Sequence, residues 1–131
     1  MKEIYDFIKA CPCYFIATMD GDQPRVRPFG TILLFEDKLY IQSGYKKDFA
    51  KQLAANPKIE LSAFDGKGNW IRVSATMMED SRIEAKKAML DDFPSLRAMY
   101  DENDENTAVW YMTNGKASVC SFTAAPKEIC F

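Results

Sequence analysis

The chain has 131 residues, a length typical of one domain, and carries a formal net charge of −2. With 47% hydrophobic and 27% charged residues it can form a core, which excludes a disordered chain, and no apolar run approaches the ~20 residues that span a bilayer. Histidine is absent, which removes the commonest general base and metal ligand, so we expect no metal site and expect any enzymatic activity to depend on a bound cofactor.

The amino-terminal part of the sequence predicts one helix followed by a β-hairpin. Residues 4–11 place apolar side chains at the spacing of one helical face, and Pro12 ends that helix. Residues 14–19 are rich in β-forming side chains, and Asp20-Gly21 directly after them is a strong hairpin-turn signal. We therefore expect the first strand to turn back immediately into a second one.

A long extended segment follows from Arg25 to Phe35. Pro28 and Gly30 interrupt it, and in a strand such residues indicate a sheet edge, a bulge or a point where another group approaches the backbone closely. Residues 39–42 alternate as the next strand, and residues 46–55 have the apolar spacing of a helix. This region therefore adds further strands and a second helix.

The middle of the chain contains the clearest hairpin. Residues 59–64 and 70–77 alternate apolar and polar side chains on either side of a glycine-containing turn. Ser81 and Glu84 have the spacing of a capping box, which predicts that a helix starts there, and Pro94 is expected to end or restart it.

The carboxy-terminal part is predicted to contain a second hairpin. Residues 108–112 and 117–122 flank Asn114-Gly115, a pair that favours the tight primed turn. In total we count about seven strands and three helices. Because the strands follow one another in hairpins, we predict a mainly β fold with peripheral helices, built on an antiparallel sheet or barrel and forming one domain over residues 1–131.

Two basic segments are the strongest candidates for a binding site. Arg25 and Arg27 lie two residues apart in a strand, so they project from one face, and Val26 between them is expected to point to the core. Residues 43–47 place a hydroxyl group and two lysines at the start of a helix, where free amides and the helix dipole favour phosphate. Each base alone is typical of a solvated surface, but together the two segments indicate a site for a small anion.

The distribution of charge favours a small anion over a nucleic acid. Residues 23–58 contain seven basic and three acidic side chains, whereas residues 79–105 contain nine acidic and four basic ones. A nucleic-acid groove normally needs a wider basic excess and a basic chain overall. The acidic run 101–106 lacks the mid-loop glycine of a calcium loop, and we expect it to be a solvated loop.

The order of these motifs resembles that of the pyridoxamine 5′-phosphate oxidase-like split-barrel flavoproteins, particularly their short members related to nitroimidazole reductases and general stress proteins. The resemblance extends from Ile4 to Phe131. The short motifs that carry it are Ala17-Thr18, Arg25-Val26-Arg27-Pro28, Tyr40-Ile41-Gln42-Ser43, the basic helix start and Asn56-Pro57. It implies a split β-barrel and a homodimer with FMN bound at the interface of the two subunits.

The resemblance also assigns roles to individual residues. The family strand that runs along the isoalloxazine ring of FMN matches Arg25, Val26, Arg27, Pro28 and Phe29. The family positions that hold the FMN phosphate match Ser43, Lys46 and Lys47. Aromatic or polar residues from late strands of the second subunit usually cover the flavin. Trp110 is the nearest candidate here, with Trp70 another, although a place in the core or the dimer interface is the alternative for a tryptophan.

Two departures from the family limit what can be inferred about the substrate. The longer oxidases bind pyridoxal phosphate through a carboxy-terminal extension that this sequence does not contain. Nitroimidazole reductases often place a histidine beside the flavin, and this sequence has none. We therefore leave the small-molecule substrate unidentified and assign no catalytic residue.

Three functions are compatible with these observations. The favoured hypothesis is a cytoplasmic FMN-dependent oxidoreductase without nucleic-acid or membrane partners, in which FMN supplies the redox chemistry. The alternative is a non-catalytic protein that holds flavin or another anionic cofactor, and a third is a small nucleic-acid-binding barrel. The cysteines at 11, 13, 120 and 130 are expected to be reduced thiols, because the first two are too close for the usual zinc or redox spacing.

Overall fold

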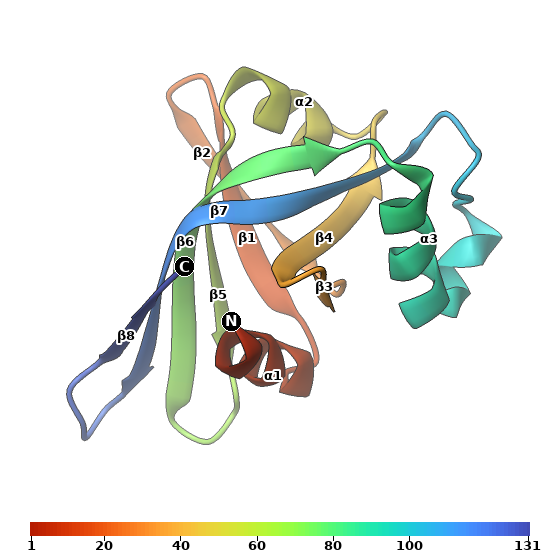
Figure 1. The fold of residues 1–131 in the computed structure, drawn as a ribbon. Helices are drawn as coiled ribbons and strands as arrows, with labels where there is room; N and C mark the ends of the chain where they lie inside the picture. Colours follow the sequence, from red (N-terminus) through yellow and green to blue (C-terminus); the bar gives the residue numbers. More distant parts are fainter.

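The computed structural model describes residues 1–131 and consists of one antiparallel sheet with three α-helices and a short 3-10 helix, η1 (Figure 1). The helices are α1 (Lys2–Ala10), α2 (Asp48–Ala55), α3 (Ile83–Asp92) and η1 (Pro94–Ala98). The strands are β1 (Tyr14–Asp20), β2 (Gln23–Phe29), β3 (Leu33–Phe35), β4 (Lys38–Gly44), β5 (Lys58–Phe64), β6 (Asn69–Asp80), β7 (Thr107–Ser121) and β8 (Lys127–Cys130). None of the helices combines the length and the apolar character that crossing a bilayer requires.

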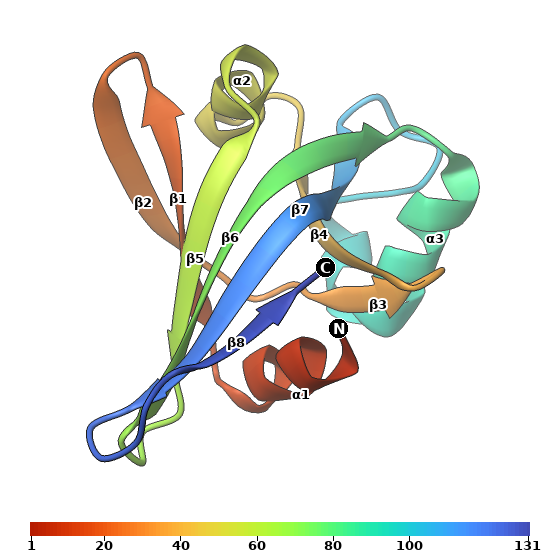
Figure 2. The same cartoon turned by 60° about the vertical axis from the view of Figure 1, so that its left-hand side comes forward.

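The sheet is open and follows the order β2-β1-β5-β6-β7-β4-β3, with β8 added to β7. All strand pairs are antiparallel, which confirms the predicted mainly β, antiparallel fold. The sheet does not close into a complete barrel, and this open arrangement is consistent with a split barrel. Both views place α2 between β1 and β2 on one side and β4 on the other (Figures 1 and 2). Helix α2 therefore packs across the space between the two halves of the open sheet.

The core lies on the concave face of the sheet and follows the alternation seen in the sequence. Ile59, Leu61 and Ala63 of β5 are buried, whereas Glu60 and Phe64 of the same strand are exposed. Helix α1 covers one end of this core with its apolar face, and α3 packs against a smaller apolar cluster beside β3, β4 and β7. The predicted helix over residues 4–11 and the hairpin of β5 and β6 are confirmed.

The predicted turn at Asn114-Gly115 is wrong. Strand β7 runs through this pair without turning, and the ladder with β6 shifts there by one residue, so two residues of β7 oppose Ala75 alone. Asn114 has φ 49°, a left-handed conformation that asparagine tolerates in a bulge as well as in a turn. Gly115 leaves room for the ring of Phe131, which an added Cβ would approach to 2.1 Å and displace. Strand β7 therefore replaces two predicted strands. The extended run expected from Arg25 to Phe35 is divided into β2 and β3, and β8 adds a further strand, so there are eight strands instead of seven.

The predicted capping box is also wrong in detail. A helix does begin in this region, but its N-cap is Arg82 and no side chain caps it, so Ser81 and Glu84 do not form the reciprocal pair. Asp80 instead accepts hydrogen bonds from the backbone and the guanidinium of Arg82. Pro94 begins η1, which confirms that the helical path restarts there.

Candidate functional site

A cleft of about 460 Å³ opens where β2 and β4 meet α2 and η1. Ligand pockets in proteins commonly measure roughly 300–1,000 Å³, so this cleft can hold a small molecule. Its polar and charged lining consists of Arg27, Thr31, Gln42, Ser43 and Lys47. The remainder of its lining consists of Pro28, Phe29, Gly30, Phe49, Leu96, Met99 and Tyr100.

The charge of the cleft has one sign. Arg27 and Lys47 are its two charged residues, and no carboxylate lines it. The Lys47 ammonium group forms neither an ion pair nor a side-chain hydrogen bond within the chain. A cleft lined by two positive charges and by aromatic rings suits an anion attached to an aromatic body.

Arg27 is fixed in place by neighbours from two elements, β1 and α2. Its Nη1 donates to Thr18 Oγ1 at 2.7 Å, and its Nη2 donates to Gln52 Oε1 at 2.7 Å. The guanidinium also lies over the ring of Phe49, 5.1 Å from the centroid. Burial lowers the pKa of Arg27, and nearby Asp48 raises it in part. The group is therefore oriented before any ligand arrives, which reduces the entropy lost on binding.

Ser43 and Lys47 reach the cleft from the end of β4 and the turn that leads into α2. Ser43 is buried, and its hydroxyl has no hydrogen-bond partner in the chain, yet no fully buried side-chain oxygen is unsatisfied, so this hydroxyl faces the cleft. Lys47 is the N-cap residue of α2. The first amides of a helix have no intrahelical acceptor and carry partial positive charge, so the turn offers further donors to an anion.

The apolar wall is made by packed aromatic rings. Phe29 of β2 lies 4.7 Å from Phe49 of α2, centroid to centroid, and Phe29 also packs 6.0 Å from Tyr14. Phe49 in turn contacts Trp110 edge to face at 5.7 Å. This wall belongs to the main core, so its shape is set by packing of the whole domain.

The opposite wall comes from η1 and the residues directly after it. Leu96 and Tyr100 are largely covered, whereas Met99 is 71% exposed at the mouth of the cleft. This wall could not be predicted from the sequence, because its residues meet the cleft only through the tertiary fold. The one signal in the sequence was Pro94, which marked a short helical segment without indicating what it faces.

The structure brings five of the nine predicted site residues to this cleft: Arg27, Pro28, Phe29, Ser43 and Lys47. It does not bring the other four, Arg25, Val26, Lys46 and Trp110, there. Arg25 pairs with Asp20 at 3.2 Å on the surface. Trp110 is only 5% exposed and packs between Tyr45 and Phe49, the position in the core that was the alternative for this residue.

The predicted direction of Val26 is wrong. Val26 pairs with Ala17 and Arg27 pairs with Ile16 in the ladder of β1 and β2, and paired residues point to the same side. Since Ile16 is fully buried, the arginine face of β2 is the inner one and Val26 is turned outward, 68% exposed. The sequence pattern predicts the opposite direction because apolar residues of a strand usually face the core. In β2 the polar residues lie on the inner face, where they meet α2 and the cleft.

Comparison with known proteins identifies relatives of this chain. The family model described as pyridoxamine 5′-phosphate oxidase matches residues 1–125. A solved structure of a NimC/NimA family protein from Clostridium acetobutylicum is 42% identical, with a TM-score of 0.96 over 100% of this chain and 92% of that one. General stress protein 26 from Bacillus anthracis is 14% identical, with a TM-score of 0.76 over 99% of this chain and 98% of that one.

A heme binding protein from Mycobacterium smegmatis shares the fold at 11% identity, with a TM-score of 0.69 over 92% of this chain and 53% of that one. Among proteins with curated functions, none matches the sequence significantly.

Proposed function

The chain belongs to the pyridoxamine 5′-phosphate oxidase family, and we propose that it binds FMN in the cleft and acts as an FMN-dependent oxidoreductase. The observation that carries this proposal is the composition of the cleft, which combines Arg27, Ser43 and Lys47 with an aromatic wall and has no carboxylate. FMN has the matching chemistry, because it joins a phosphate dianion to a flat aromatic ring system.

The cleft has hydrogen-bond donors suited to the phosphate of this cofactor. The hydroxyl of Ser43 lacks a partner in the chain, and the ammonium group of Lys47 lacks a counter-ion, so both can serve the phosphate. Arg27 adds a guanidinium that is already oriented by Thr18 and Gln52. FMN, when bound, would supply the electron transfer between a donor and an acceptor. The chain itself would bind, orient and partly shield the cofactor, and we assign no side chain as acid or base.

We also propose that the protein functions as a homodimer through the convex face of β1, β2, β5 and β6. Phe15, Val26 and Phe64 are each more than half exposed there, and Trp70 lies on the same face opposite Phe64. Contiguous exposed apolar side chains of this kind mark interaction surfaces. Pro28 is paired with Phe15 and also lines the cleft, so a second copy seated on this face would lie next to the cofactor.

The dimer is tested by sedimentation velocity at micromolar concentration, with Val26→Asp as the disrupting variant. We expect a dimer for the unchanged chain and a monomer for the variant, because a charge would be buried in an apolar interface. A monomer for the unchanged chain at these concentrations would contradict the dimer proposal.

Titration of the purified protein with FMN, followed by its visible absorption spectrum, tests the cofactor proposal. Saturable binding with a perturbed flavin spectrum supports it, and no binding contradicts it. A parallel titration with haem addresses the chemistry of the fold relative described as a heme binding protein. Preferential binding of haem over FMN would replace the flavin assignment.

A second assay distinguishes an enzyme from the alternative, a non-catalytic flavin-binding protein. The FMN-loaded protein is mixed with NADH or NADPH, and bleaching of the flavin absorbance is followed by reoxidation with an added acceptor. Turnover over many cycles supports the oxidoreductase, whereas stoichiometric FMN binding without reduction supports the non-catalytic role.

A further inference from the structure

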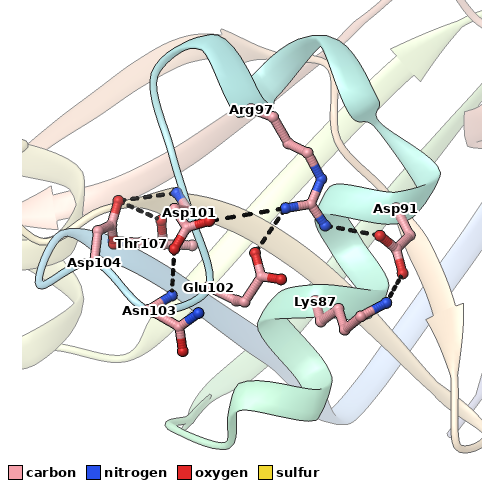
Figure 3. Close-up of polar contacts among 8 residues, drawn as sticks. All are labelled: Lys87, Asp91, Arg97, Asp101, Glu102, Asn103, Asp104 and Thr107. Atoms are coloured by element: carbon pink, nitrogen blue, oxygen red, sulfur yellow. Dashed lines mark hydrogen bonds and ion pairs between the residues drawn. The ribbon is translucent and has the colours of Figure 1, made fainter.

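The acidic segment between η1 and β7, which the sequence indicates as a solvated loop, makes ordered contacts to both sides of the cleft. We call residues 101–106 the connecting loop. It begins directly after Met99 and Tyr100, which line one wall, and ends at the residue before β7. Figure 3 shows that the carboxylates of Asp101, Glu102 and Asp104 point toward neighbouring donors and that Arg97 reaches between this loop and Asp91.

Arg97 joins η1 to two other elements. Its Nη2 donates to Asp91 Oδ1 of α3 at 2.7 Å, and its Nη1 donates to Glu102 Oε2 of the connecting loop at 2.7 Å (Figure 3). Asp101 Oδ1 lies 4.0 Å from the same Nη1. The Glu102 side chain is only 14% exposed, so this pair is better shielded than an ordinary surface ion pair.

The wall carried by η1 has few other anchors. Its backbone bonds are local, with the amides of Met99 and Tyr100 both donating to the carbonyl of Leu96 at 2.9 Å. No residue of η1 itself is buried. Tyr100, directly after η1, is the one buried residue of this wall. A short segment with local backbone bonds and little buried surface opens easily, so its position depends on the side chains that tie it to the rest of the fold.

The other end of the connecting loop holds the turn that carries Lys47. Asp104 accepts from the amides of Asn106 and Thr107, which fixes the end of the loop. Asn106 then accepts from two amides of the turn: its backbone carbonyl from Tyr45 at 2.8 Å and its Oδ1 from Lys46 at 3.1 Å. Gly44 is needed for this contact, since an added Cβ would lie 2.9 Å from Asn106 Nδ2.

We propose that Arg97 is a positioning residue: by joining η1 to Asp91 and to the connecting loop, it holds the Leu96 to Tyr100 wall opposite the turn of Ser43 and Lys47 and so slows release of the bound cofactor. The part of this inference that concerns release rests on the proposed binding of FMN. The part that concerns the position of the wall rests on the contacts of Arg97 alone.

The test compares three variants with the unchanged protein. Arg97→Met removes the guanidinium, and Arg97→Lys keeps one positive charge. Lys127→Met is the matched control, because Lys127 also makes an exposed 2.7 Å ion pair, with Glu3, away from the cleft. Hydrogen exchange of the 93–106 segment reports whether the wall is held, and the rate at which FMN fluorescence recovers after dilution reports cofactor release.

For Arg97→Met we expect exchange in 93–106 and FMN release both to accelerate by about tenfold, as for the loss of ~1.4 kcal/mol of local stability. Arg97→Lys should recover part of both effects, and Lys127→Met should change neither. Unchanged exchange in Arg97→Met overturns the proposal, and so does faster exchange with unchanged FMN release. If the unchanged protein does not bind FMN, the proposed function fails, while the exchange comparison still decides whether Arg97 holds the wall.

Discussion

The two walls of the cleft are built in different ways. The wall formed by β2, β4 and α2 belongs to the main core: Phe29 and Phe49 pack on it, and Arg27 is tied to Thr18 and Gln52. The opposite wall has one buried residue, Tyr100, whereas η1 itself has none and is tied to the fold by exposed or half-buried ion pairs. We infer that the first wall determines which ligand binds, and that the second adjusts how long it stays.

The cationic groups of the core wall provide the largest expected effect. Replacing Arg27 and Lys47 together by alanine removes two charged donors, each worth ~1.5–3 kcal/mol, so FMN affinity should fall by at least about 100-fold. Lys51→Ala is the control, since Lys51 is an exposed lysine of the same helix that does not line the cleft. FMN affinity is measured by fluorescence titration, and equal loss in Lys51→Ala would indicate a nonspecific charge effect.

A pair of substitutions compares the stability of the two walls. Phe49→Ala should lower the free energy of unfolding by about 3–5 kcal/mol, because Phe49 is 4% exposed and packs against Phe29 and Trp110. Met99→Ala should lower it by less than about 0.5 kcal/mol, because that side chain is mostly exposed. Urea denaturation measures both values. Similar losses in the two variants would remove the distinction between the walls.

The dependence of folding stability on acid pH tests the contacts at the start of α3, the helix to which Arg97 ties the η1 wall. Hydrogen bonds from Arg82 lower the pKa of Asp80 to about 2, and Tyr40 also donates to this carboxylate. A lowered pKa means that the charged form is favoured in the folded state, so its contribution is present above about pH 4 and is lost as the pH falls toward 2. Asp80→Asn should flatten stability across this window in thermal melts. An unchanged pH dependence would show that other carboxylates dominate.

The smallest effect is expected for the predicted residues that the structure places outside the cleft. Arg25→Ala and Lys46→Ala should each change FMN affinity by less than about threefold, since long-range attraction between exposed charges is weak and screened by salt. Titration at 0.15 M salt is the appropriate measurement. A tenfold loss of FMN affinity in either variant would mean that this side chain contacts the ligand and that the binding site extends beyond the cleft.

The sequence was sufficient for the parts of the fold that depend on local patterns. The alternation in residues 59–64 and 70–77 predicted β5 and β6, and the segment 43–47 predicted donors at the start of a helix that the structure places at the cleft. Side chains whose position is set by a local order of strand, turn and helix can be located from the sequence in this way. Ser43 and Lys47 belong to this class.

The sequence was not sufficient where tertiary contacts choose between local alternatives. Asn114-Gly115 suits a turn and a bulge equally well, and the long ladder between β6 and β7 selects the bulge. The direction of Val26 depends on which face of β2 meets α2, a fact outside the strand itself. The η1 wall depends on the ion pairs of Arg97, whose partners lie on two other segments.

The proposed function requires that the cleft recognise the phosphate of a flavin. The most direct test is calorimetric titration of the cofactor-free protein with FMN and, separately, with riboflavin, which has the same ring system without the phosphate. We expect FMN to bind at least about 100-fold more tightly than riboflavin, because the contacts of Lys47, Ser43 and Arg27 would be lost with the phosphate. Equal affinity for the two molecules, or no affinity for either, would contradict the claim.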